Sequence, residues 1–343
     1  MRTLSRRELN RALLARQLLL ERAEAPLPAA LERVAGIQAQ YAPSMYIGSW
    51  SRVAGLERGT LTGALERREV VQATLMRVTI HLVSRADYWP LALATRDARR
   101  TLWLRARRDT PTAREMEAAA AALRERLAWG PLRRKEIEAL VGRTAANGVG
   151  LWIDLVRAPP SGTWERRRAD LYAAAEDWLG PPEPDAAATA VEHLVRRYLA
   201  GFGPASRKDV ASFTGLAPAA LAPVLDGLEL RRFRSEGGDE LLDVPDAPLP
   251  DPRTPAPPRF LPTWDATLLV HARRTGLLPE EYRPRIFNTK LPQSLPTFLV
   301  DGEVAGTWRH VDGEIHLEPF APLETAARRG LREEADRLAA FHA

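Results

Sequence analysis

The chain has 343 residues, of which 45% are hydrophobic and 27% are charged, and its formal net charge is +5. This composition is that of a globular protein and excludes wholesale disorder. The sequence contains no cysteine, which excludes disulfides, thiolate zinc sites and cysteine nucleophiles. Its first residues lack the apolar core of a signal peptide, and no stretch approaches the roughly 18 apolar residues of a membrane helix. We therefore expect a cytoplasmic protein with no membrane partner.

The first hundred residues predict helices that flank two short strands. Ser5 and Glu8 have the spacing of a capping box, so a helix should begin there. A second helix is expected over residues 27–36. The segment VVQATLMRVTIHLVS (residues 70–84) is rich in β-branched residues and predicts two strands. A long basic helix follows over roughly residues 85–107.

A repeat in the middle of the chain predicts duplicated modules. The segments LAWGPLRRKEIEALVG (127–142) and LAGFGPASRKDVASFTG (199–215) share a Gly-Pro followed by Arg-Lys-acid-aliphatic, at a constant offset of 73 positions. Each copy predicts a helix, a turn, a second helix and a β-hairpin with a basic tip, which is the winged-helix arrangement. Residues 31–36 align with residues 137–142, which indicates a degenerate first copy.

The C-terminal part has a different pattern. A proline-rich linker precedes short strands, and Asp301-Gly302 and Asp312-Gly313 are hairpin signals between them. We expect an α+β fold, mainly helical, with three tandem winged-helix modules followed by a small C-terminal antiparallel β-barrel. The expected domains are winged helix 1 (1–108), winged helix 2 (109–184), winged helix 3 (185–246), the linker (247–262), and the barrel with its closing helix (263–343).

Motifs for common catalytic chemistry are missing. The six histidines do not have the spacing of metal ligands, and there is no nucleophile elbow, P-loop or dinucleotide fingerprint. We therefore expect neither a metal nor a cofactor. One unusual feature is a pair of glutamines, Gln38 and Gln40, in the apolar and aromatic run GIQAQYAPSMYIGSW (36–50). They are either turn residues that hydrogen-bond to nearby backbone or residues of a reaction site.

This run carries a resemblance to a known family. GIQAQYAPSMYIGSWSR resembles the Gln-apolar-Gln segment of the AlkZ/YcaQ-type bacterial winged-helix DNA glycosylases. Three later segments resemble further landmarks of that family, in the same order: TLMRVTIHLV, RFLPTWDATLLVHARR and LPTFLVDGEVAGTWR. The resemblance implies a fold curved around duplex DNA, with Gln38 and Gln40 as the catalytic residues of the Gln-x-Gln branch. Ala39 is smaller than the middle residue of the family pattern.

The implied chemistry suits a pair of carboxamides. A glutamine cannot take up a proton at neutral pH, but a purine alkylated at N7 is already cationic and leaves as a neutral base. The enzyme then needs only to position a water and stabilise developing charge. We expect a monofunctional DNA glycosylase that hydrolyses the N-glycosidic bond of N7-alkylated purines, including bulky or interstrand-crosslinked adducts, with a water held by the two glutamines. Since a crosslinked base cannot be flipped fully out of the duplex, the glutamines should line an open groove.

Clustered basic residues indicate where DNA would bind. The expected DNA-contacting residues are Arg77, His81, Arg166, Arg167, Arg168, Arg231, Arg232 and Arg234. We expect a monomer whose partner is double-stranded DNA with alkyl or crosslink lesions, acting in DNA repair or in self-resistance to a DNA-alkylating natural product. Trp264, Asp265, His271 and Arg273 belong to a family landmark without an assigned role.

Two other functions fit the same modules. The main alternative is a non-enzymatic winged-helix transcription regulator, although regulators usually dimerise on palindromes with one recognition module per protomer. The other is a protein that binds and sequesters a drug.

Overall fold

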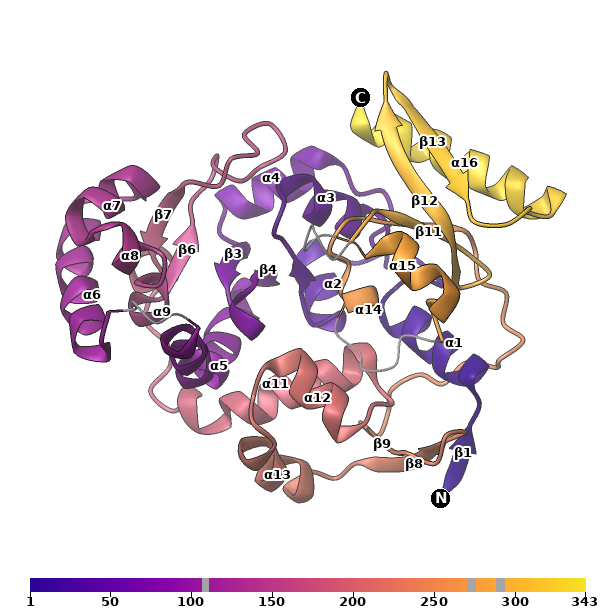
Figure 1. Ribbon diagram of the computed structural model, residues 1–343, viewed down its shortest axis with the longest axis horizontal. Helices are drawn as coiled ribbons and strands as arrows, with labels where there is room; N and C mark the ends of the chain where they lie inside the picture. Colours follow the sequence, from indigo (N-terminus) through magenta and orange to yellow (C-terminus); the bar gives the residue numbers. More distant parts are fainter. Residues whose placement is uncertain (107–110, 270–275, 288–293) are drawn as a thin grey trace.

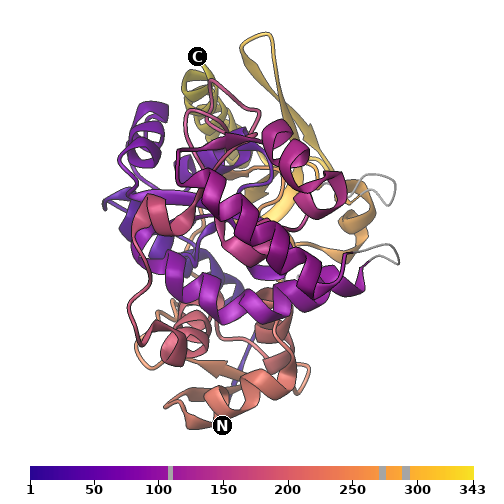
Figure 2. The same cartoon turned by 90° about the vertical axis from the view of Figure 1, so that its left-hand side faces the viewer.

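The fold mixes helices and strands, with about half of the chain helical. The computed structural model describes residues 1–106, 111–269, 276–287 and 294–343. Figure 2 places the C-terminal hairpin at one end of the molecule and the helices that follow residue 185 at the other. Most of the first half of the chain lies between these two ends, whereas the N-terminus lies at the same end as the later helices.

The N-terminal elements follow the predicted order. They are β1 (Arg2–Leu4), α1 (Arg6–Arg16), α2 (Leu27–Arg33), β2 (Ile37–Gln38), α3 (Ala42–Trp50), α4 (Arg58–Glu66), β3 (Val70–Thr74), the 3-10 helix η1 (Met76–Val78), β4 (Ile80–Ser84) and α5 (Arg85–Arg105). The capping box of Ser5 and Glu8 is formed at the start of α1, which confirms that prediction. The two strands expected between residues 70 and 84 are the antiparallel pair β3 and β4.

The repeat appears as two sets of helices with the predicted offset. The first set is α6 (Ala113–Leu127), β5 (Leu132–Arg133), α7 (Arg134–Val141), α8 (Arg143–Ala146), α9 (Gly150–Ile153), β6 (Leu155–Arg157), β7 (Leu171–Ala174) and α10 (Ala175–Leu179). The second set is α11 (Ala186–Phe202), α12 (Arg207–Thr214), α13 (Pro218–Gly227), β8 (Arg231–Ser235) and β9 (Glu240–Asp243). The starts of α6 and α11 are 73 positions apart, and so are those of α7 and α12. Each set contains helices followed by an antiparallel strand pair. Their assignment as winged helices, and the module boundaries, stay predictions.

Sheets connect parts of the chain that the sequence treats as separate modules. One six-stranded sheet has the order β2-β4-β3-β6-β7-β5, because β3 pairs with β6. A second sheet has the order β1-β8-β9, in which the N-terminal strand lies parallel to β8 (Figure 1). Residues 2–4 therefore pack with the third predicted module, far along the chain from the first module to which the sequence assigns them.

The C-terminal part contains an open sheet. Its elements are β10 (Arg259–Leu261), α14 (Ala266–Leu269), η2 (Glu280–Tyr282), α15 (Arg283–Ile286), β11 (Thr297–Val300), β12 (Glu303–Val311), β13 (Glu314–Pro319) and α16 (Thr325–His342). The described strands have the order β10-β11-β12-β13, and the two outer strands do not pair with each other there. No closed barrel is thus found in the described residues.

A helix covers the face that barrel closure would enclose. Leu331, Leu338 and Phe341 of α16 pack in one apolar cluster with Phe298 and Trp308 of the sheet. The predicted closing helix is confirmed, and it buries the apolar side of the sheet without further strands.

Candidate active site

Gln38 and Gln40 lie in an extended segment between α2 and α3. Gly36 turns the chain out of α2 with φ 79°, and a Cβ at this position would lie 2.9 Å from Val83 Cγ1. Gln38 ends β2, which is an edge strand of the six-stranded sheet. The Ala39 N–H donates a hydrogen bond to the Ile80 carbonyl at 2.7 Å. The glutamines therefore sit at a helix exit, as the sequence predicts, and β4 fixes their backbone.

The two carboxamides have different surroundings. Gln40 Oε1 accepts a hydrogen bond from the Ile80 N–H at 2.7 Å, which leaves the Gln40 NH2 group as a donor. Gln38 is only 5% exposed, and its carboxamide has no hydrogen-bond partner among the residues that the structure describes. The turn-residue interpretation therefore fits Gln40 but not Gln38. Gln38 is buried and Gln40 is half-buried, and the open groove around them stays a prediction.

His81 lies directly opposite Gln38 on the neighbouring strand. The hydrogen bond from Ala39 to Ile80 makes this a non-hydrogen-bonded pair, the type in which facing side chains are closest. His81 Nδ1 lies 3.0 Å from the Thr79 carbonyl, and because a carbonyl only accepts, Nδ1 carries the proton. Nε2 is buried and has no partner in the described part of the chain. The expected DNA contact by His81 is not supported, because the side chain is buried.

Arg77 is engaged inside the protein. Its guanidinium donates to the Phe213 carbonyl and lies 5.2 Å from the centre of the Phe213 ring. Burial lowers the pKa of Arg77 to about 10. Arg77 therefore joins η1 to α12, and the structure does not support its prediction as a DNA contact.

The loop between β6 and β7 carries exposed arginines next to the glutamine segment. Arg166, Arg167 and Arg168 are all exposed. Arg167 Nη1 lies 3.3 Å from the hydroxyl of Tyr41, the residue that follows Gln40. Arg166, Arg167 and Arg168 also line a cavity of about 310 Å³. Of the three, Arg167 contacts the glutamine segment, and Arg168 forms an ion pair with Asp170 at 3.2 Å, so their role in binding phosphate stays a prediction.

The arginines of β8 divide into two kinds. Arg231 forms an ion pair with the buried carboxylate of Asp243 and also donates to the Ala247 carbonyl. Arg232 is exposed and lies 2.8 Å from Glu240, and Arg234 is exposed as well. Arg232 and Arg234 are exposed on β8, with Arg232 paired to the exposed Glu240, whereas Arg231 has a structural role that the sequence does not reveal.

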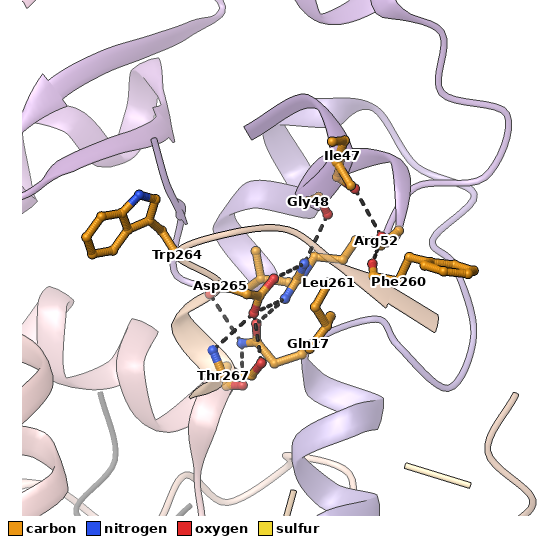
Figure 3. A network of polar contacts seen from close by, with 12 residues as sticks. Gln17, Ile47, Gly48, Arg52, Phe260, Leu261, Trp264, Asp265 and Thr267 are labelled. Carbon is orange, nitrogen blue, oxygen red and sulfur yellow. Dashed lines mark hydrogen bonds and ion pairs between the residues drawn. The ribbon is translucent and has the colours of Figure 1, made fainter. Parts of the chain in front are cut away.

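Asp265 belongs to a buried network that ties α3 to the C-terminal part (Figure 3). Its two carboxylate oxygens each accept a hydrogen bond from Arg52 at 3.0 Å, and both side chains are buried. The same carboxylate accepts from the Thr267 N–H and hydroxyl at the start of α14. Arg52 Nη1 also donates to the Gly48 carbonyl at 3.0 Å. Asp265 therefore has a structural role.

Trp264 lies beside this network in an unusual conformation. Its φ is 69°, and its N–H donates to the Ser294 hydroxyl at 2.9 Å. The indole is half-buried and points away from Arg52 and Asp265 (Figure 3). His271 and Arg273 lie outside the described residues.

Comparison with known proteins identifies the family. The family model described as "DNA glycosylase AlkZ-like" matches residues 31–341, nearly the whole chain. The chain belongs to the AlkZ-like DNA glycosylase family. It is therefore a DNA glycosylase, an enzyme of DNA repair whose partner is DNA. This sets aside the non-enzymatic regulator as the main alternative.

A solved structure agrees with this AlkZ-like assignment. The chain is similar to Streptomyces sahachiroi DNA glycosylase AlkZ, with a TM-score of 0.83 and 19% sequence identity. The match covers 99% of this chain and 98% of that chain. A comparison with curated protein sequences gave no match.

The described part of this AlkZ-like chain contains neither a membrane-spanning helix nor a cluster of metal ligands. No helix in the described ranges is long and apolar enough to cross a membrane. No group of three or more His, Asp or Glu side chains among the described residues could hold a metal ion.

Exposed and buried arginines of this AlkZ-like protein should respond differently to replacement. We expect the triple change Arg166→Ala, Arg167→Ala, Arg168→Ala to weaken binding to all DNA sequences. The slope of log affinity against log salt should flatten by about 0.9 for each DNA phosphate that the variant no longer binds. The measurement is DNA affinity at several salt concentrations. Arg231→Ala is the control, because it breaks an internal ion pair and should lower the melting temperature with little effect on the slope. A triple variant with the wild-type slope would place the DNA elsewhere.

The stability of the AlkZ-like chain should decrease in mild acid because of His81. Burial lowers the pKa of His81 to about 3, whereas an unfolded histidine titrates near 6.5. Between these values the unfolded chain binds a proton that the folded chain does not. Stability is therefore complete above about pH 6.5 and falls as the pH drops toward about 3. We expect the melting temperature of wild-type protein to fall more, between about pH 7 and about pH 5, than that of His81→Gln. Equal losses in the two proteins would contradict the buried, neutral ring.

Proposed function

We propose that this glycosylase is monofunctional and hydrolyses the N-glycosidic bond of N7-alkylated purines in double-stranded DNA, including bulky or crosslinked adducts. The observation that carries the proposal is Gln38 on an edge strand: the residue is only 5% exposed, its carboxamide has no described hydrogen bond, and its polar atoms, unlike His81 Nε2, are not sealed from solvent. A carboxamide that is held in place but bound to no described residue is available to a molecule that approaches from solvent. The exposed arginines of residues 166–168 lie next to the same segment.

The residues present suit this leaving group. An N7-alkylpurine carries a positive charge, so the C1′–N9 bond can break without an acid that protonates the base. The sugar then develops positive charge, which carboxamide oxygens can stabilise, and a water must approach C1′. An unmodified purine would need an acid to assist its departure. We therefore expect strong discrimination against undamaged DNA.

The surroundings of the glutamines favour action on the duplex by one copy of the chain. The arginine loop and Tyr41 meet on one side of the glutamine segment, so a phosphate backbone can be bound near the reacting sugar. We propose that the enzyme works as a monomer, either in general repair or in self-resistance to a DNA-alkylating natural product.

Base release without a metal is the expected result of the test. Purified protein is incubated in EDTA with a duplex that contains one N7-methylguanine, and abasic sites are converted to strand breaks by alkali. We expect breaks at the modified position only, and no covalent trapping by borohydride, since a monofunctional enzyme forms no Schiff base. Inhibition by EDTA would contradict the proposed chemistry. Absence of breaks with both N7-methylguanine and crosslinked duplexes would favour a protein that only binds its ligand.

A further inference from the structure

Two unpaired polar groups face each other across β2 and β4. The Gln38 carboxamide has no partner in the described ranges, and neither has His81 Nε2. The two residues are 5% and 2% exposed. Their register as a non-hydrogen-bonded pair brings the side chains together on one face of the sheet. Such a juxtaposition of unsatisfied groups suggests a site for a small polar molecule.

An attacking water needs two hydrogen-bond acceptors, and the two glutamines do not clearly supply both. A water that attacks C1′ must direct one lone pair at the carbon, so its two hydrogens should be donated to two acceptors. Gln40 Oε1 already accepts from the Ile80 N–H, which engages one of its two lone pairs and fixes the direction of the carboxamide. Gln38 Oε1 can supply one acceptor. A second acceptor is required: Gln40 Oε1 has one lone pair left beside its bond to Ile80, whereas His81 Nε2 is not engaged by any described residue.

We propose that His81 is a catalytic residue, whose Nε2 accepts a hydrogen bond from the attacking water and receives its proton. The proposal rests on the glycosylase function proposed above. The tautomer is the appropriate one, since Nδ1 is bound to the Thr79 carbonyl and Nε2 then carries a lone pair. Gln38 has no hydrogen bond to a described residue that would hold its side chain in place, so admitting a water beside Nε2 breaks none of the bonds described.

Atoms and charges balance in this step. The C1′–N9 bond breaks, and its electron pair stays on N9, which neutralises the cationic purine. A lone pair of the water forms the C1′–O bond, and the oxygen becomes positively charged. One of its protons moves to His81 Nε2 and from there to solvent water. An imidazole is a stronger base than a carboxamide, and burial, which lowers the pKa of His81, keeps the ring neutral at the start of the step, although it also weakens the ring as a base.

The other cross-strand neighbour of His81 is small. Ala73 of β3 lies opposite His81, and the charge of Arg77, after burial, also lowers the pKa of His81. The one described hydrogen bond of the His81 ring, to the Thr79 carbonyl, links residues only two apart in the chain and joins no separate elements. It therefore does not explain why an ionisable ring is buried there. A buried ring with one unsatisfied nitrogen is costly as a purely structural element.

The test compares His81 with a matched buried residue. Gln72 of β3 resembles His81 in being buried with one polar atom bonded and the other not. Its Nε2 donates to the Gly162 carbonyl at 2.9 Å, and its Oε1 has no partner among the described residues. Gln72 faces the opposite side of the sheet, because it pairs with Leu82 while Ala73 pairs with His81. His81→Leu and Gln72→Leu therefore remove comparable groups from the two faces. Single-turnover rates at saturating protein separate the chemical step from DNA binding.

We expect His81→Leu to slow base release from N7-methylguanine DNA by about 10²-fold or more, at unchanged DNA affinity. His81→Gln, whose oxygen can still accept a hydrogen bond, should lie between His81→Leu and wild-type protein. Gln72→Leu should keep the wild-type rate. A folded His81→Leu protein with a rate within about threefold of wild type would overturn the proposal, whereas wild-type protein without base release would overturn the glycosylase function on which it rests.

A second measurement does not depend on activity. In the ¹⁵N NMR spectrum of labelled protein, the signals that disappear in His81→Gln report the ring of His81. We expect a protonated Nδ1 and an unprotonated Nε2 at neutral pH. The reverse tautomer, or a charged ring, would overturn the proposal even if His81→Leu does not fold.

Discussion

Gln38→Ala should slow base release from N7-methylguanine DNA by about 10²–10³-fold and leave the melting temperature almost unchanged. The loss of one positioned polar group in a reaction site typically raises the barrier by about 2.7–4 kcal/mol. Stability should be spared because the Gln38 carboxamide makes no hydrogen bond to the described residues. The measurement is a single-turnover time course, paired with a thermal melt of the same sample.

Gln40→Ala is the matched comparison. Its carboxamide oxygen accepts from the Ile80 N–H, so this variant should lose about 1 kcal/mol of unfolding free energy in addition to rate. The two variants thus separate chemistry from stability. If Gln38→Ala lowered the melting temperature and kept the rate, the residue would be a packing element and the proposed site would be wrong.

Asp265→Ala should destabilise the fold by about 3–5 kcal/mol, because it leaves the buried guanidinium of Arg52 without its counter-charge. The measurement is the free energy of unfolding in denaturant. Activity at temperatures where the variant stays folded should remain close to wild type, since the carboxylate is bound to Arg52 and Thr267. The double change Arg52→Met, Asp265→Leu is the control and should recover much of the stability, because no buried charge is left unpaired. A stable but inactive Asp265→Ala protein would instead give Asp265 a catalytic role.

Local sequence signals determined much of the secondary structure. The capping box at Ser5, the two strands of residues 70–84 and the offset of the repeated helices could all be predicted, because each depends on residues close in the chain. The pairing of strands from different modules could not be predicted from the sequence. Neither the pairing of β3 with β6 nor that of β1 with β8 leaves a mark in local periodicity. The barrel is not confirmed: the described strands form an open sheet, and α16 covers its apolar face through tertiary packing.

Residue type identified the glutamines but not the burial of their neighbours. Gln38 and Gln40 stand out as polar residues in an apolar run. The residue that lies opposite Gln38, His81, is determined by the register of β2 on β4, which the sequence does not show. Arginine clusters suggest DNA contacts, yet Arg77 and Arg231 have partners inside the protein. A basic residue near a strand end has the same appearance in sequence whether it binds phosphate or a buried carboxylate. Exposure, which only the fold provides, separates the two.

The double variant Gln38→Ala, Gln40→Ala tests the central claim most directly. Its single-turnover rate on duplex DNA with one N7-methylguanine is compared with those of wild-type protein and of both single variants, below the melting temperature of each. Under the proposal that the two glutamines act on one water, the double variant should be little slower than the poorer single variant, about 10²–10³-fold below wild type. A folded double variant that releases the base at the wild-type rate would contradict the account.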